Sequence, residues 1–242
     1  MKVLAFNSSP KKDKGNTSLI LKPFLDGMKE AGADVELLYT KDLKINPCQG
    51  EFNCWLKTPG HCFQQDDMQM IYPKLSSDVI VFATPLYVDG INASMKNIMD
   101  RMLPIVEPFI ELHEGHCRHP SRDKKIAEQG KVVLVSTCGF WEIDNFDSII
   151  FHIKAICLNM PRKFAGALLR PHCNAFQSML AMGAPVKDIL EAAQEAGRQL
   201  VKNGKMSEKT LNTISRELIP RETFIQMANQ TFTQVIEAAQ KS

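Results

Sequence analysis

The sequence predicts an α/β fold in which a doubly wound, five-stranded parallel sheet carries helices on both faces. Five short segments have the character of strands. Val3–Phe6, Val79–Ala83 and Val132–Ser136 are apolar runs, and the other two are Asp34–Tyr39 and a segment within Phe164–Leu169. Amphipathic helical patterns separate these segments, as parallel strands require, since each pair needs a long crossover. The chain has 242 residues, 44% of them hydrophobic, which is enough for one compact domain.

The helical patterns follow the same order. The first begins at Gly15-Asn16-Thr17, places Leu19, Ile20, Phe24, Leu25 and Met28 on one face, and ends at Gly32. Further helices are predicted around Gln65–Leu75, Ala93–Leu103 and Asp144–Cys157. A helix from Pro185 to about Asn203 should pack back on the sheet. Residues 207–238 are typical of one or two more helices, interrupted at Pro220.

Composition excludes several classes of protein. The 29 basic and 27 acidic side chains form no basic stripe interleaved with aromatic residues, so we expect no nucleic-acid partner. No apolar run approaches the length of about 20 residues that spans a bilayer, and the N-terminal apolar run is too short for a signal peptide. We therefore expect a cytoplasmic protein without membrane contact. Seven cysteines, an odd number, do not suggest a disulfide framework.

The segment from Ser8 to Ser18 joins the first strand directly to the first helix. It brings hydroxyl groups, backbone N–H groups and the positive end of the helix dipole to one place, which favours an anion. It lacks both the Gly-Lys-Ser/Thr ending of a P-loop and the glycine spacing of a dinucleotide fingerprint. An ordinary helix cap without a ligand is the alternative. A ligand crevice should lie beyond the carboxyl ends of the strands, where loops 7–17, 84–92 and 137–142 converge.

A second segment, Thr84-Pro85-Leu86-Tyr87-Val88-Asp89-Gly90, follows the third strand, and the next helix carries Ala93, Met95, Lys96, Met99, Asp100 and Arg101. With the first loop, it resembles the NAD(P)H-dependent FMN reductase family of flavodoxin-like proteins. In that family the first loop reads roughly G/N-S-P-R/K-x-x-G-N-T and the third reads P-I/L-Y-x-x-x-x-x-A-x-M-K-x-x-M/L-D-R. The likeness covers about residues 1–170. It implies the strand order 2-1-3-4-5 and an FMN-binding domain. With the helical patterns described above, we assign residues 1–205 to this domain and residues 206–242 to a C-terminal helical extension.

The resemblance also implies which residues bind FMN. The first loop would hold the phosphate through Ser8, Ser9, Lys11, Asn16, Thr17 and Ser18. The second would run along the isoalloxazine edge with Pro85, Leu86, Tyr87 and Val88, and the third would contribute Thr137, Cys138, Gly139 and Phe140. Tyr87 has an alternative role as a buried aromatic anchor. We assign no catalytic residue, because the flavin itself carries the chemistry in such enzymes.

Three cysteines, Cys48, Cys54 and Cys62, lie in the long segment INPCQGEFNCWLKTPGHCFQQDDM. This segment resembles the loop of iron–sulfur flavoproteins in which C-x-x-C-x-x-C and a fourth cysteine ligate a [4Fe–4S] cluster. The three cysteines match the first, third and fourth positions, and Glu51 occupies the second. A carboxylate is a poor ligand for such an iron, so we expect no bound metal. A three-cysteine cluster with an open or Glu51-ligated iron is the alternative.

Between Leu112 and Lys131 the chain carries His113, His116, Cys117 and His119, which could hold zinc. The stretch lacks a C-x-x-C partner, and we do not expect a zinc site. By resemblance, His119-Pro120 and Arg122 match an H-P-x-R element near the flavin edge or a subunit interface. Arg122 would then be a partner for an anionic group such as a dinucleotide phosphate.

The resemblance implies an oxidoreductase in which FMN takes a hydride from NAD(P)H and passes electrons to a quinone, flavin, nitro compound or metal acceptor. One alternative is a non-enzymatic FMN electron carrier, although such carriers tend to be strongly acidic and this chain is not. A phosphate-binding module without redox chemistry would leave Thr84–Tyr87 unexplained. A homodimer or homotetramer is expected by resemblance, with the cysteine loop, residues 104–130 and the helical tail as candidate contacts.

Overall fold

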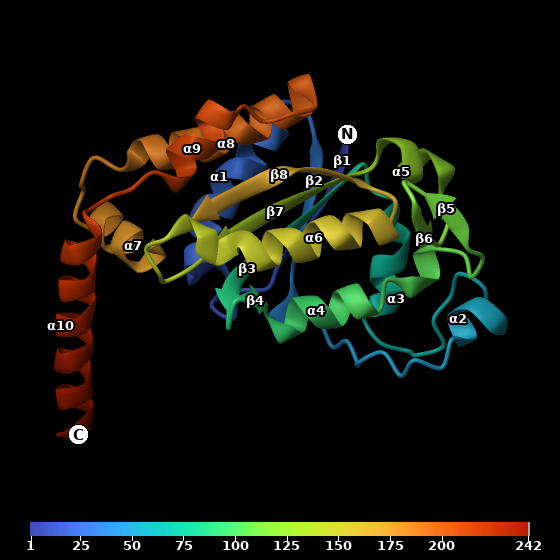
Figure 1. Cartoon of the computed structure of the whole chain (residues 1–242), viewed down its shortest axis with the longest axis horizontal. Coiled ribbons are helices and arrows are strands. Elements are labelled where there is room, and N and C mark those ends of the chain that lie inside the picture. Colours follow the sequence, from blue (N-terminus) through green and yellow to red (C-terminus); the bar gives the residue numbers. More distant parts are fainter. Residues whose placement is uncertain (242) are drawn as a thin grey trace.

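The computed structural model describes residues 1–241 and contains the predicted parallel sheet (Figure 1). The strands are β1 (Lys2–Asn7), β2 (Asp34–Tyr39), β3 (Val79–Tyr87), β7 (Lys131–Thr137) and β8 (Lys163–Arg170). Their order is β2-β1-β3-β7-β8, and neighbouring strands run parallel. The predicted α/β fold with strand order 2-1-3-4-5 is therefore confirmed.

Alternate residues of each strand serve two separate cores, because successive side chains point to opposite faces of a sheet. Val3 and Ala5 face α1 (Asn16–Glu30) and α8 (Lys187–Asn203), whereas Leu4 and Phe6 face the other side. There the sheet is covered by α3 (Met68–Ile71), α4 (Ala93–Asp100) and α6 (Asp147–Asn159). Figure 1 shows α1, α8 and α9 on one face of the sheet and α4 and α6 on the other.

Two glycines allow α1 and α8 to pack with their backbones in contact. A Cβ atom on Gly27 would overlap the carbonyl of Gln194, and one on Gly197 would overlap the carbonyl of Phe24. Neither glycine has a positive φ, so close approach rather than backbone conformation requires them. This contact fixes α1, whose N-terminus borders the predicted ligand crevice.

Several predicted helices are shorter in the structure, and prolines explain two of the differences. The helix expected over Gln65–Leu75 is α3 followed by the 3-10 helix η3 (Tyr72–Ser76), since Pro73 lacks an N–H. Similarly, α4 ends at Asp100, and η4 (Leu103–Ile105) contains Pro104. The helix expected from Asp144 starts as η5 (Ile143–Phe146) and continues as α6.

Other elements were not predicted. They are the short strand β4 (Gly90–Ile91), the hairpin of β5 (Glu111–His113) and β6 (His116–Arg118), and the helices α2 (Asn53–Leu56), α5 (Lys124–Gln129) and α7 (Cys173–Ala181). Two short 3-10 helices were also not predicted: η1 (Lys12–Lys14) lies in the loop after β1, and η2 (Thr40–Asp42) directly follows β2.

The C-terminal segment forms two helices separated at Pro220, as predicted. The first, α9 (Glu208–Ser215), packs on α8 and β8, and its Ile214 is fully buried. The second, α10 (Arg221–Gln240), has no buried residue and projects away from the rest of the chain (Figure 1). Within residues 1–241, no helix combines the length and the hydrophobicity needed to cross a membrane.

Candidate functional site

A cleft of about 200 Å³ lies at the carboxyl ends of β1, β3, β7 and β8, where an open α/β sheet is expected to bind its ligand. Its walls come from four loops far apart in the sequence. The lining residues are Ser9, Pro10, Lys11, Gly15, Asn16, Thr17, Pro85, Leu86, Tyr87, Thr137, Cys138, Gly139, Cys173 and Asn174. The structure thus brings together ten of the fourteen residues predicted to bind the cofactor.

The first loop leaves the N-terminus of α1 open toward this cleft. Gly15 is the N-cap residue and offers no side chain to cap the helix. The first N–H groups of α1 are therefore available to a ligand, together with the positive end of the helix dipole. A Cβ atom on Gly15 would overlap the hydroxyl of Ser9, so glycine is required for the loop to fold this closely. Lys11 is exposed and forms no ion pair within the described residues.

Ser8 and Ser18 lie behind the cleft rather than in its wall. Ser8 is buried and donates both its N–H, at 2.9 Å, and its hydroxyl, at 3.3 Å, to the carbonyl of Ala83. The Ser18 hydroxyl donates to the Lys12 carbonyl at 2.7 Å and accepts from the Asn7 amide at 2.9 Å. These hydrogen bonds stabilise the conformation of the loop. Because both hydroxyls already bond within the protein, their geometry does not favour direct contact with a phosphate.

The second loop places a short apolar edge beside the cleft. Pro85 and Leu86 are half-buried, and Tyr87 is 49% exposed, so the alternative of a buried Tyr87 anchor is wrong. After Tyr87 the chain turns sharply into β4 through Val88 and Asp89, which both have positive φ values, 46° and 58°. A β-branched valine rarely adopts this conformation. Val88 is fully exposed at the tip of the turn and does not line the cleft.

The third and fourth loops are joined by backbone hydrogen bonds. The Cys138 N–H donates to the Arg170 carbonyl at 3.2 Å, and the Cys173 N–H donates to the Cys138 carbonyl at 2.9 Å. Thr137 and Thr17 exchange a hydrogen bond between hydroxyls at 3.1 Å, which ties the third loop to α1. Phe140 is 63% exposed and lies outside the cleft wall, contrary to its predicted place.

Asn16 links the first loop to the fourth. Its side-chain amide donates to Asn174 Oδ1 at 2.8 Å and to the Cys173 sulfur at 3.2 Å. Its own Oδ1 is buried and has no hydrogen-bond partner among the described residues. A buried acceptor without a partner is costly, and a ligand hydroxyl would satisfy it.

Sequence reasoning missed Cys173 and Asn174. They follow the last strand, so the rule that located the other three loops also applies to them. Neither residue belongs to a recognisable motif, and only the position of the strand end could have indicated them.

The cysteines of the cleft are neutral thiols. Burial raises the pKa of Cys138 to about 12, with a further contribution from neighbouring Cys173, and burial also raises the pKa of Cys173. Because the thiolate is the nucleophilic form, neither side chain is activated for covalent catalysis at neutral pH. The cleft therefore offers binding groups rather than a protein nucleophile.

The donor set of the cleft fits FMN in three respects. Lys11, the Thr17 hydroxyl and the open helix terminus would bind a phosphate. The unpartnered Asn16 Oδ1 would accept from a sugar-alcohol hydroxyl. Pro85, Leu86 and Tyr87 form an apolar edge of the kind that a flat ring system packs against.

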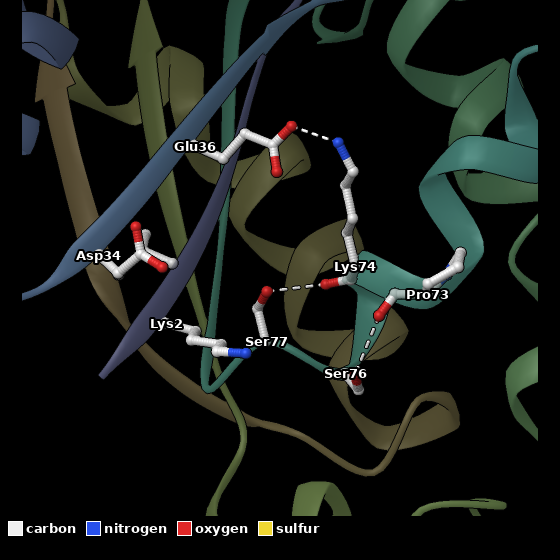
Figure 2. Close-up of a pocket in the computed structure, with 8 residues that line it drawn as sticks. Lys2, Asp34, Glu36, Pro73, Lys74, Ser76 and Ser77 are labelled. Atoms are coloured by element: carbon white, nitrogen blue, oxygen red, sulfur yellow. Dashed lines mark hydrogen bonds and ion pairs between the residues drawn. The ribbon is translucent and has the colours of Figure 1, made fainter.

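A second hollow, of about 230 Å³, lies at the opposite end of the sheet (Figure 2). It is lined by residues from the amino ends of β1 and β2 and from η3, including Lys2, Asp34, Glu36 and Lys74. Lys74 forms an ion pair with Glu36, as Figure 2 shows, and the Lys2 N–H donates to Asp78 at 2.8 Å. Amino ends of parallel strands are not where such folds bind ligands, so we assign no function to this hollow.

The cysteine loop is organised around a buried ion pair. Arg101 and Asp66 are almost fully buried and lie 2.7 Å apart, and Arg101 also donates to the Cys62 sulfur at 3.3 Å. Burial alone would raise the pKa of Asp66, but hydrogen bonds from Arg101 and two backbone N–H groups lower it overall. Arg101 is the last residue of the motif that follows the third strand, at the end of α4. Its contacts with Asp66 and Cys62 hold the cysteine loop against the rest of the chain.

The three cysteines of this loop do not fit a four-cysteine cluster. Cys48 is exposed, Cys54 is buried and Cys62 is held by Arg101. Burial, with smaller effects of Cys62 and Glu51, raises the pKa of Cys54 and opposes the thiolate that a metal needs. Among residues 1–241, no three histidine, cysteine or acidic side chains are grouped as metal ligands, and this includes the histidine-rich hairpin.

Arg122 does not line the cleft of its own chain. The alternative place for it, a subunit interface, stays a prediction. Arg122 donates to the Pro104 carbonyl at 3.1 Å and lines a depression with Tyr72, Leu75 and Arg162. That depression is at the amino ends of β3 and β8. His119 packs its ring on Trp55, with centroids 4.6 Å apart, and so connects the hairpin region to the cysteine loop.

Among curated proteins, the relatives found are iron-sulfur flavoproteins. One from Methanocaldococcus jannaschii is 35% identical over 106 residues, which are 43% of this chain and 53% of that protein. One from Archaeoglobus fulgidus is 37% identical over 105 residues, which are 43% of this chain and 46% of that protein. The match with these relatives thus spans about half of their length.

Solved structures share the fold at low identity. An FMN-dependent NADH-azoreductase from Bacillus anthracis, solved in complex with FMN, superposes with a TM-score of 0.59 at 16% identity, covering 84% of this chain and 100% of that chain. An NAD(P)H:quinone oxidoreductase from Methanothermobacter marburgensis gives a TM-score of 0.56 at 17% identity, covering 83% of this chain and 96% of that chain.

A family model described as NADPH-dependent FMN reductase matches residues 1–142, which is more than half of the chain and includes three of the four cleft loops. The chain belongs to the NADPH-dependent FMN reductase family.

Proposed function

We propose that this chain is an FMN-dependent oxidoreductase that passes electrons from NADH or NADPH to a small acceptor such as a quinone, a flavin, a nitro compound or a metal complex. The observation that carries the proposal is the convergence of four loops on one cleft, with anion-binding groups on one side and an apolar edge on the other. Membership of the FMN reductase family supports the choice of cofactor and electron donor.

The residues of the cleft would bind and orient the cofactor. Bound FMN would supply the redox chemistry, taking a hydride from the nicotinamide and releasing electrons to the acceptor. Lys11, the Thr17 hydroxyl and the first N–H groups of α1 would neutralise the phosphate. The ring would lie along Pro85–Tyr87, and Tyr87 is exposed enough to contact an incoming substrate as well.

A mechanism in which FMN carries the chemistry also explains why the cleft contains no activated nucleophile. Cys138 is the one nucleophilic side chain from the third loop, and its raised pKa keeps it protonated. We therefore assign to the protein the tasks of binding, orientation and access rather than acid–base or covalent catalysis.

A non-enzymatic FMN carrier is the competing possibility, because the cleft would bind FMN equally well in either case. Reduction by a nicotinamide cofactor separates the two. Purified protein should show the absorption bands of bound flavin, and anaerobic addition of NADPH or NADH should bleach them. Flavin bands that neither nucleotide bleaches would identify a carrier, and a colourless protein that does not take up FMN would contradict both.

We further propose that the chain works without an iron–sulfur cluster, although its curated relatives are named iron-sulfur flavoproteins. The three cysteines present, the Glu51 substitution and the engagement of Cys62 by Arg101 support this. Iron analysis after anaerobic purification provides the test. Stoichiometric iron and acid-labile sulfide would contradict it, and flavin without iron is the expected result.

A further inference from the structure

Another hollow, of about 490 Å³, lies where the tip of the β5–β6 hairpin meets the C-terminal end of α6 and the start of β8. We call it the α6 hollow. Its volume falls within the range of about 300–1,000 Å³ that is typical of small-molecule sites. Much of its wall is apolar and comes from Ala127, Cys157, Leu158, Pro161 and Phe164. Burial raises the pKa of the Cys157 thiol to about 12, so this side chain is neutral as well.

Arg162 lines the α6 hollow and is a buried cation, only 5% exposed. Its Nη1 donates to the Ser77 carbonyl at 3.0 Å and its Nη2 to the Leu75 carbonyl. Its Nε is buried and has no hydrogen-bond partner among residues 1–241. Burial lowers the pKa of Arg162 to about 10, which leaves the guanidinium charged at neutral pH. A buried charge without a counter-ion is costly, and an anion in the α6 hollow would supply one.

The carboxylates nearest to Arg162 are engaged elsewhere. Asp78 forms an ion pair with Lys125 at 3.3 Å. Asp123 caps α5 by accepting from the Ile126 N–H at 3.1 Å. Both attract the guanidinium electrostatically, but neither forms an ion pair with it within the described part of the chain. The protein's own side chains therefore leave the charge of Arg162 without a direct partner.

Two lysines add to the positive charge of the α6 hollow. Lys154 and Lys163 both line it, and neither forms an ion pair with another described residue. The Lys154 ammonium lies 5.8 Å from the centre of the Phe164 ring, so cation and apolar wall are adjacent. Glu114, at the tip of the hairpin, is the one carboxylate among the lining residues and is also unpaired. The α6 hollow is thus apolar and carries a net positive charge.

These features set the α6 hollow apart from the other two hollows described above. It lies at the amino end of β8 and shares no lining residue with the carboxyl-end cleft, so FMN bound in the cleft would leave it free. In the hollow of Figure 2 the charges of Lys74 and Glu36 pair with each other. In the α6 hollow the cations have no such partner, and an anionic ligand would not have to displace one.

We propose that the α6 hollow is a second ligand site, which takes a small carboxylate carried on an apolar body, such as a fatty acid or an aromatic acid. The carboxylate would lie beside Arg162 and Lys154, where a charge-assisted contact is available. The apolar body would pack against Leu158 and Phe164. A fully hydrated inorganic anion would leave this apolar wall unused.

Calorimetric titration of the full-length protein with octanoate, in the presence of excess FMN to occupy the cleft, tests the proposal. We expect one octanoate per chain with a dissociation constant below about 1 mM. Octanol, which has the same chain without the charge, should bind at least about tenfold more weakly. Arg162→Gln should weaken octanoate binding by at least about tenfold, and Lys154→Gln by about threefold or more. The control is Lys187→Gln, which removes a charge from α8 on the opposite face of the sheet and should leave the affinity unchanged.

Other outcomes would overturn the proposal. They are no saturable binding by the wild type, octanol binding as tightly as octanoate, and several octanoates bound per chain, as for unspecific uptake by exposed apolar residues. Equal affinity of the wild type and Lys154→Gln would also contradict it. Circular dichroism checks that Arg162→Gln is folded, and if it is not, the comparison of Lys154→Gln with Lys187→Gln decides. The variants lie outside the cleft, so the result does not depend on whether FMN binds.

Discussion

Arg170 and His172 form a fully buried pair in which the arginine Nη2 lies 3.0 Å from Nε2 of the imidazole. Arg170 has no carboxylate partner among the described residues and donates instead to the carbonyls of Ile214 and Arg216, at 2.7 and 2.8 Å. The same His172 nitrogen accepts from the Leu218 N–H at 3.2 Å. The end of β8 is thereby joined to the chain that leads into α10, and the pair requires a neutral imidazole.

This pair predicts a loss of stability in mild acid. Burial, with the charge of Arg170 as a second cause, lowers the pKa of His172 to about 4, against about 6.5 in an unfolded chain. Between these values the unfolded state binds more protons than the folded state, so stability falls as pH decreases from about 6.5 toward 4. We expect a loss of about 2 kcal/mol between pH 7.5 and 5, measured by urea unfolding.

The variant His172→Gln isolates this effect, because glutamine accepts hydrogen bonds but does not titrate. Its free energy of unfolding should change less between the two pH values than that of the wild type. His152, whose pKa is also lowered by burial, is present in both proteins and cancels in the comparison. Identical pH dependence in the two proteins would contradict the role of His172.

The buried Arg101–Asp66 pair predicts a large effect of removing one charge. Asp66→Asn would leave a buried guanidinium without its counter-ion and should destabilise the protein by about 3–5 kcal/mol. The control is Asp100→Asn, which breaks the exposed Lys96–Asp100 pair and should cost less than about 1 kcal/mol. Thermal or urea unfolding measures both. Similar small losses would mean that the pair does not hold the cysteine loop.

The contact between α1 and α8 reverses the usual effect of a glycine-to-alanine change. In an exposed helix, Gly→Ala stabilises by up to about 1 kcal/mol. At Gly197 the added methyl group would overlap the Phe24 carbonyl and approach the Met28 nitrogen at 2.8 Å, so Gly197→Ala should destabilise by at least about 2 kcal/mol. At Gly139, where no atom lies within 4 Å, the same change should have little effect on unfolding.

Lys11 and Lys74 provide a matched test of which end of the sheet binds the cofactor. Lys11 lines the cleft at the carboxyl ends, and Lys74 lines the hollow at the amino ends. Lys11→Gln should weaken FMN binding about tenfold, since it removes a charge-assisted contact to the phosphate, and added salt should reduce the difference. Lys74→Gln should leave FMN affinity unchanged. The opposite ranking would move the site to the amino ends.

Sequence alone predicted the sheet because its central strands, β1, β3 and β7, are mostly buried and form nearly continuous apolar runs, which helical patterns separate along the chain. The hairpin Glu111–Arg118 escaped prediction because its strands are polar and exposed and its turn, Glu114-Gly115, is not among the usual hairpin pairs. The helix over Gln65–Leu75 was predicted too long, since Pro73 interrupts the backbone ladder.

The cleft was predicted from sequence motifs, which identified most of its lining residues but could not identify residues outside a motif. Lys11, Thr17 and Tyr87 line it as expected. Ser18 matches the motif equally well but points inward, because its hydroxyl closes the loop onto Lys12. Asn174 has no motif and enters the cleft only through the end of β8. Whether a loop residue lines the cleft depends on the direction of its side chain, which a sequence motif does not specify.

The central claim, that FMN binds in the carboxyl-end cleft, is tested most directly by titrating FMN with the protein and following the quenching of flavin fluorescence. The account predicts saturation at one FMN per chain, and at least about tenfold weaker binding by Gly15→Ala, whose methyl group would displace Ser9 at the open end of α1. Absence of quenching by the wild type, or equal affinity in Gly15→Ala, would contradict it.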